Sequence, residues 1–127
     1  MTATPAVFSQ EAAQRPDQQV SASGVKYVSG GIGAGARQAM NGVRKEYNLR
    51  LTFARPGTDE YLSDVHVRAE NNQGISVLDA LSHGPFLFAR LPPGTYRISA
   101  AFDGETQDRR ITVSMDHPKG LVFYFAD

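Results

Sequence analysis

The sequence predicts a mainly β protein, an antiparallel sandwich with one short N-terminal helix. The first observation is the segment 91–113, where a Pro-Pro-Gly turn leads into an alternating run, an Asp103-Gly104 pair and a return run. Proline favours the turn, and Asp-Gly favours a type I′ hairpin. The second observation is a series of seven short β-prone runs from residue 49 onward. Their spacing of about 8–12 residues, with turn residues between them, is typical of sandwiches.

The N-terminal part divides into a tail and a helix. Residues 1–24 are rich in Gln, Ser and Pro, and we expect a disordered tail because such a segment buries little apolar surface. A single domain then spans residues 25–127, opening with the β-prone run 25–28. We expect a helix over about residues 33–46, where apolar residues recur at the i, i+3, i+4, i+7 spacing of one face. These residues are Ala36, Ala39, Met40, Val43 and Tyr47.

From residue 47 the hydrophobic period changes to two, as in half-buried strands. The seven expected strands are 49–53, 65–70, 75–78, 86–91, 96–102, 110–115 and 121–125. The last run, Leu121–Phe125, is apolar on both faces. It is therefore either a strand covered on both sides or an edge strand that another subunit covers. We favour cover by the chain's own helix, and a homodimer through Leu121–Phe125 is the alternative.

Composition excludes several classes of function. Thirteen basic residues balance thirteen acidic ones, so the basic excess of a nucleic-acid binder is missing. The chain has no cysteine, which excludes disulfides, thiolate nucleophiles and sulfur-ligated zinc. No run reaches the roughly 20 apolar residues of a membrane span. The small, polar, Pro-containing start resembles that of a mature secreted chain, so we expect a periplasmic or secreted protein whose leader has been removed.

The glycine-rich run Gly31–Ala36 matches the pattern G-x-G-x-x-A and opens the expected helix. A dinucleotide site also needs a βαβ unit and an acidic residue about 20 positions further on. This chain has Arg50 and Arg55 in that window, so we expect no cofactor. The favoured interpretation is a flexible turn, with an anion held at the helix N-terminus by Gly31, Gly33 and Gly35 as a further hypothesis.

Catalytic patterns are weak. The three histidines, His66, His83 and His117, do not show the close spacing of metal ligands. No G-x-S-x-G elbow accompanies them, and the carboxylates lie beside turns, where aspartate is common. We therefore expect no catalytic residue and no metal site. A small metal- or His-dependent hydrolase that uses His66 or His83 is the alternative.

A cationic platform is the main candidate binding surface. Five basic residues fall on strand positions opposite the apolar ones: Arg50, His66, Arg68, Arg90 and Arg97. If their strands are neighbours in one sheet, these side chains form a polar surface for an anionic or sugar ligand. The alternative is an ordinary solvated sheet face whose arginines protect against aggregation.

The segment Leu91–Ala100, with Asp103-Gly104 and the return run 110–113, resembles the carboxypeptidase regulatory-like domains. Their pattern is L-x-P-G-x-Y-x-V-x-A, followed by a glycine turn and a V-x-V strand. The resemblance covers about residues 25–126 and implies a seven-stranded antiparallel, transthyretin-like (prealbumin-like) Greek-key sandwich, like small bacterial envelope proteins. Hydrolytic relatives end in Tyr-Arg-Gly-Ser, whereas this chain ends in Phe123–Asp127, so the resemblance carries over no catalytic residue.

The resemblance implies a non-enzymatic accessory module of the cell envelope that binds a protein or a glycan. Besides the hydrolase, a second alternative is a structural protein that assembles through its C-terminal strand.

Overall fold

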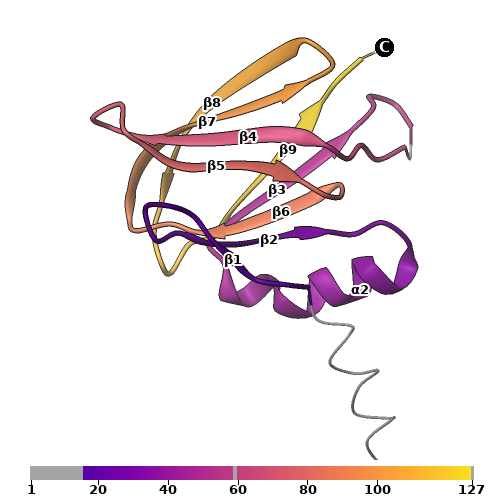
Figure 1. Ribbon diagram of the computed structural model, residues 1–127, viewed down its shortest axis with the longest axis horizontal. Coiled ribbons are helices and arrows are strands. Elements are labelled where there is room, and N and C mark those ends of the chain that lie inside the picture. Colours follow the sequence, from indigo (N-terminus) through magenta and orange to yellow (C-terminus); the bar gives the residue numbers. More distant parts are fainter. Residues whose placement is uncertain (1–15, 59, 127) are drawn as a thin grey trace, which may run out of the picture.

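The computed structural model describes residues 16–58 and 60–126. These residues form nine strands, one α-helix and one 3-10 helix. The strands make two sheets that face each other across a hydrophobic core (Figure 1). The mainly β, two-sheet prediction is confirmed, but two strands precede the helix in addition to the seven expected ones.

The five-stranded sheet has the order β1-β2-β6-β3-β9. Its strands are Gln19–Val20, Lys26–Gly30, Phe86–Arg90, Leu49–Ala54 and Lys119–Tyr124, in that order. All its pairs are antiparallel except β3 with β9, which is parallel. The expectation of a wholly antiparallel fold is therefore wrong at this pair. The chain enters β9 at the end where β3 begins, and the Lys119 amide donates to the Asn48 carbonyl at 2.9 Å.

The four-stranded sheet has the order β5-β4-β7-β8 and is wholly antiparallel. Its strands are Ser76–Ser82, Val65–Asn71, Gly94–Phe102 and Glu105–Val113, in that order. The β7–β8 hairpin turns at Asp103 and Gly104, whose φ angles of 52° and 84° are both positive, as the predicted type I′ turn requires. At the start of β7, the Tyr96 hydroxyl donates to the Pro92 carbonyl at 2.7 Å, which ties the Pro-Pro-Gly turn to the strand.

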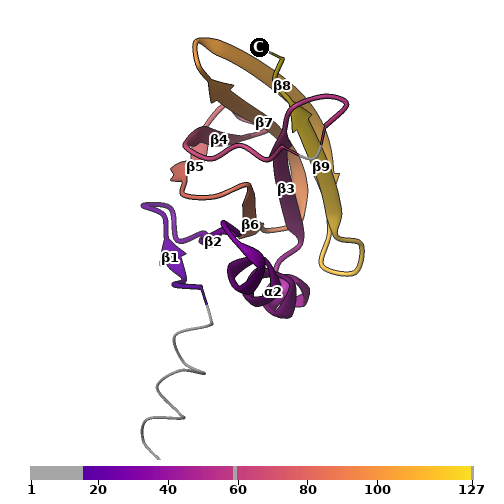
Figure 2. The ribbon, with the colours of Figure 1, turned by 90° about the vertical axis from the view of Figure 1, so that its right-hand side faces the viewer.

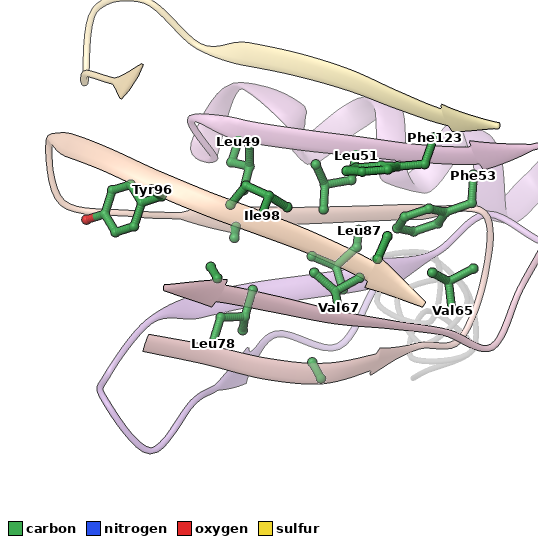
Figure 3. Packing of buried hydrophobic residues seen from close by; sticks show 14 of the residues in the cluster. Leu49, Leu51, Phe53, Val65, Val67, Leu78, Leu87, Tyr96, Ile98 and Phe123 are labelled. Atoms are coloured by element: carbon green, nitrogen blue, oxygen red, sulfur yellow. The ribbon is translucent and has the colours of Figure 1, made fainter. Parts of the chain in front are cut away.

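Alternate residues of both sheets fill the space between them (Figure 3). Leu49, Leu51 and Phe53 of β3 are fully buried, and Phe53 lies 6.0 Å from Phe123 of β9 between ring centroids. Asn48 is the buried polar exception beside β3. Its side-chain amide donates to the Leu91 carbonyl and accepts from the Leu91 amide, both at 2.8 Å, so it replaces a missing backbone pair.

The helix α2, Ala34–Val43, continues into the 3-10 helix η1, Arg44–Glu46, close to the predicted 33–46. It lies against the outer face of the five-stranded sheet (Figure 2). A second, smaller core joins them: Val28, Met40, Val43, Tyr47 and Phe88. No helix in the described part of the chain is long and apolar enough to cross a membrane.

Two expectations about the ends of the domain change. Residues 1–15 of the predicted tail lie outside the described residues. Within residues 16–24, however, β1 pairs with β2, the Tyr47 hydroxyl donates to Gln18 Oε1 at 2.9 Å, and Ser21 Oγ donates to the Val77 carbonyl at 2.8 Å. The domain therefore begins before residue 25, because these polar residues bond to the sheets instead of burying apolar surface.

The C-terminal strand β9 is an edge strand. Its residues Val122 and Tyr124, on the outer face, are 38% and 51% exposed. The prediction that the chain's own helix covers this strand is wrong, because α2 packs on β2 and β6 through Val28 and Phe88.

Candidate functional site

The five predicted platform residues do not share one surface. Arg50 of β3 and Arg90 of β6 lie on the outer face of the five-stranded sheet, whereas His66, Arg68 and Arg97 lie on the outer face of the four-stranded sheet. The two sheets enclose the core between them. These residues therefore belong to two surfaces on opposite sides of the molecule.

On the four-stranded sheet the cations are paired with carboxylates. Arg68 stands directly across from Asp79, and Arg97 directly across from Glu70, an arrangement that favours opposite charges. His66 Nε2 contacts Asp79 Oδ1. Arg97 lies 3.2 Å from Glu70, and Arg68 lies 3.6 Å from Glu70 and 3.9 Å from Asp79. The predicted binding residues on this surface thus have acidic neighbours, as in the solvated-face interpretation, whereas Arg110 of β8 stands across from Arg97.

The outer face of the five-stranded sheet carries a groove of about 390 Å³ beside α2. The helix supplies one wall with Arg37, Met40, Asn41 and Arg44, whose i, i+3, i+4, i+7 spacing places them on one helix face. The floor comes from β3, β6 and β9. Its residues are Arg50, Thr52, Phe86, Phe88, Gly120, Leu121 and Val122. The groove is thus an apolar hollow with three arginines around it.

These three arginines lack acidic partners. Among the described residues, Arg37, Arg44 and Arg50 have no carboxylate oxygen within 4.0 Å. Arg37 lies over the Tyr61 ring, with its guanidinium carbon 5.7 Å from the ring centroid. Burial lowers the pKa of the Arg50 guanidinium, and the neighbouring charge of Arg44 lowers that pKa further. The groove therefore holds positive charge that the surrounding residues do not neutralise.

Hydrogen bonds within the protein hold two of the arginines in place. Arg50 Nε donates to the Arg44 carbonyl at 3.1 Å, and Arg44 Nη1 donates to Asn41 Oδ1 at 3.4 Å. Arg90, at the far end of β6, donates from Nη1 to the Glu46 carbonyl at 3.0 Å and does not line the groove. Of the two predicted residues on this face, only Arg50 contributes to it.

The glycine-rich turn has a packing explanation. Gly31 has φ of 106°, and a Cβ there would lie 2.4 Å from the Phe86 ring, so only glycine fits. Gly33 is the N-cap of α2, with φ of 89° and no side-chain cap bond. A Cβ at Gly33 or Gly35 would meet open space. An anion held by Gly31, Gly33 and Gly35 stays an untested prediction.

The described residues show no catalytic constellation. They contain no group of three His, Cys, Asp or Glu side chains that could hold a metal ion. His66 contacts Asp79 alone among carboxylates, while His117 interacts with Ser114 and His83 is exposed at the end of β5. The convergence of two histidines and a carboxylate that a hydrolase of this type needs is not seen in this part of the chain.

Side chains from β8 occupy part of the free edge of β9. Gln107 Nε2 donates to the Tyr124 carbonyl at 2.6 Å, and Arg109 Nη2 donates to the Val122 carbonyl at 3.3 Å. The Arg109 guanidinium carbon also lies 5.0 Å from the centroid of the Phe123 ring. A second copy that paired through Leu121–Phe125 would have to displace these bonds, so the homodimer stays a prediction with a competing intramolecular contact.

The chain matches no protein-family model and no curated protein sequence. The transthyretin-like resemblance therefore stays an untested prediction from the sequence.

The groove combines residues that sequence reasoning had treated separately. The sequence pattern assigns Met40 to the apolar face of the helix and does not single out Arg37 or Arg44 as binding residues. The spacing of Arg37 and Arg44, seven residues apart around Met40 and Asn41, was the available signal for a basic rim beside the apolar stripe. No local pattern indicates that β9 lies beside β3 and leaves Gly120 in the floor.

Proposed function

We propose that the protein is a non-enzymatic binding module that recognises an anionic ligand in the groove between α2 and the outer face of the five-stranded sheet. The observation that carries this proposal is the set of three arginines without a carboxylate partner, Arg37, Arg44 and Arg50, around an apolar floor. Pockets for small ligands are typically apolar hollows with a few polar groups that orient the ligand.

The contrast with the opposite surface supports this choice. Arg68 and Arg97 on the four-stranded sheet have acidic neighbours, so an anion at these two residues would compete with fixed carboxylates. In the groove an incoming anion would meet no such competitor among the described residues. Guanidinium groups bind carboxylates and phosphates through paired hydrogen bonds, so the groove favours an anion over a neutral sugar.

A transthyretin-like fold and a location in the bacterial envelope belong to the same proposal. They rest on the Leu91–Ala100 motif and on its resemblance to the carboxypeptidase regulatory-like domains. The Tyr96–Pro92 bond is consistent with this motif, because tyrosine side chains that bond back to a preceding turn recur in β-sandwiches. The ligand is then an envelope component, free or displayed on a glycan or protein.

Binding of small anions tests the proposal. We expect citrate, inorganic phosphate and benzoate to cause saturable shifts of backbone amide resonances in β3, β6 and α2, and uncharged maltose to cause none. Arg50→Gln should weaken anion binding about tenfold or more, since a charge-assisted bond contributes about 1.5–3 kcal/mol. Arg110→Gln is the matched control, because Arg110 is an exposed arginine on β8 outside the groove. Equal affinities of the two variants, or no shifts with any anion, would overturn the proposal.

A further inference from the structure

The chemistry of the groove narrows the ligand, on the condition that the proposed function holds. The positive charge is not spread evenly along it. Arg37 and Arg44 are seven residues apart on the helix, which separates their backbones by about 10 Å. Arg50 bonds to the carbonyl of Arg44, so two guanidinium-bearing residues meet at one end of the groove, while Arg37 interacts with Tyr61 at the other.

Two neighbouring cations favour a doubly charged group. Burial and, second to it, the neighbouring charge of Arg44 lower the pKa of Arg50, and no carboxylate oxygen among the described residues lies within 4.0 Å of either guanidinium. A monoanion would balance one of the two charges, whereas a dianion would balance both. A phosphate monoester also offers three terminal oxygens to guanidinium donors.

The floor next to this end is aromatic. Phe86 and Phe88 lie 6.4 Å apart between ring centroids, tilted by 40°, and Tyr61 continues the row at 5.8 Å from Phe86. Phe88 is 7% exposed, and Phe86 is half-buried. Met40 is 1% exposed and packs beneath the rings in the second core, where a polarizable thioether packs well against aromatic groups. Aromatic rings prefer offset or edge-to-face neighbours, so this floor suits a planar ring better than a flexible polar chain.

The opening of the groove depends on Gly120. This residue is the partner of Arg50 across the β3–β9 pair and lines the groove. A Cβ built there would find the Arg50 carbonyl at 3.9 Å as its one neighbour within 4 Å. The missing side chain therefore leaves space on the floor beside Arg50, and a larger residue would fill it without a backbone clash.

We propose that the groove binds a phosphate monoester that carries a planar aromatic ring, with Arg44 and Arg50 holding the phosphate and the half-buried Phe86, backed by Phe88 and Met40, receiving the ring. The volume of about 390 Å³ lies at the lower end of the range for small-ligand sites, in keeping with one ring system and its phosphate.

Four probes separate the parts of this proposal. Isothermal titration of the full chain at pH 7.5 and constant ionic strength compares phenyl phosphate, inorganic phosphate, benzoate and phenol. We expect phenyl phosphate to bind at least about tenfold more tightly than each of the other three, a factor that corresponds to about 1.4 kcal/mol. Equal affinity for benzoate would overturn the preference for a dianion, and equal affinity for inorganic phosphate would overturn the role of the aromatic floor. In both cases the proposed function would stand, whereas no binding of any anion would refute it.

Variants locate the site. Arg44→Gln and Arg50→Gln should each reduce the affinity for phenyl phosphate about tenfold or more while leaving that for phenol unchanged, and Arg110→Gln should match the wild type. Gly120→Val keeps every arginine but fills the floor, so we expect it to abolish phenyl phosphate binding at an unchanged Tm. Wild-type affinity in Gly120→Val would place the site elsewhere. Arg44 and Arg50 are at least partly exposed, so the charge variants test the proposal even if Gly120→Val unfolds.

Discussion

Arginines on the inner strands of the two sheets have different neighbours. On the four-stranded sheet, Arg68 and Arg97 stand across from Asp79 and Glu70, and Arg97 also has Arg110 across from it on β8. On the five-stranded sheet, Arg50 stands across from Phe88 on one side and Gly120 on the other, and finds no acidic neighbour within the described residues. The role of an arginine on a strand therefore depends on the residues that the neighbouring strands place beside it. The alternation of polar and apolar residues within its own strand does not determine that role.

The largest expected difference between the two faces concerns stability. Phe88→Ala removes a ring from the core beneath α2, and we expect a loss of about 3–5 kcal/mol in the free energy of unfolding. Arg68→Ala, on the opposite face, should change it by less than about 0.5 kcal/mol, as for most surface substitutions. Urea denaturation of both variants measures the difference. Similar losses would mean that α2 does not make a true core on its sheet.

Two glycines, Gly84 and Gly42, differ in how much space surrounds them. A Cβ at Gly84 would lie 2.3 Å from the Gly30 backbone, so Gly84→Ala must displace β2 and should cost about 1–3 kcal/mol. Gly42 in α2 has open space around its Cβ position, and Gly42→Ala should stabilise the protein by up to about 1 kcal/mol. Thermal unfolding of the two variants should move Tm in opposite directions. A lower Tm for Gly42→Ala would show that the helix needs flexibility there.

Stability at alkaline pH tests the core between the two sheets, where Tyr96 lies. Burial raises the pKa of the Tyr96 phenol. The stability that depends on the neutral phenol is therefore complete below the unfolded-state pKa of about 10, and is lost as the pH rises through the higher folded-state pKa. Tyr96→Phe should lose about 1 kcal/mol near neutral pH with its bond to Pro92, and should unfold with a weaker dependence on pH above 10. Parallel stability curves for the two proteins would contradict this origin.

The smallest expected effect comes from removing the acids of the four-stranded sheet. Glu70→Gln and Asp79→Asn should each cost less than about 1 kcal/mol, with a smaller cost at high salt, because these pairs are exposed and screened. The double variant leaves Arg68 and Arg97 without their carboxylate partners. We expect it to bind phenyl phosphate more weakly than the wild-type groove does, as measured with Arg50→Gln in the background. Binding equal to that of the wild type would show that free charge alone is sufficient.

Local patterns predicted much of the fold. Alternation in β3, β4 and β7 placed Leu51, Val67 and Ile98 in the core, and all three are fully buried. The type I′ hairpin and the helix boundaries also follow from residues close together in the sequence. The parallel β3–β9 pair was not predictable in this way, because its partners are some 70 residues apart and alternation does not encode strand direction.

The candidate site was less predictable for the same reason. Arg50 was a predicted binding residue, but its groove depends on which strands flank β3 and on where α2 packs. Arg68 and Arg97 follow the same alternation as Arg50, and their acidic partners come from cross-strand register. Residues that act together in this molecule are brought together by pairing between distant segments, which a single sequence leaves undetermined.

The path of the chain between the sheets has a consequence for how the protein unfolds. It crosses from one sheet to the other at β3–β4, β5–β6, β6–β7 and β8–β9. No single break in the chain therefore divides it into two segments that each contain a complete sheet. In addition, Phe123 of the last strand packs on Phe53 of β3. Because neither sheet can lose its strands without opening the shared core, the described domain should melt in one cooperative step, with no half-folded state that exposes a single sheet.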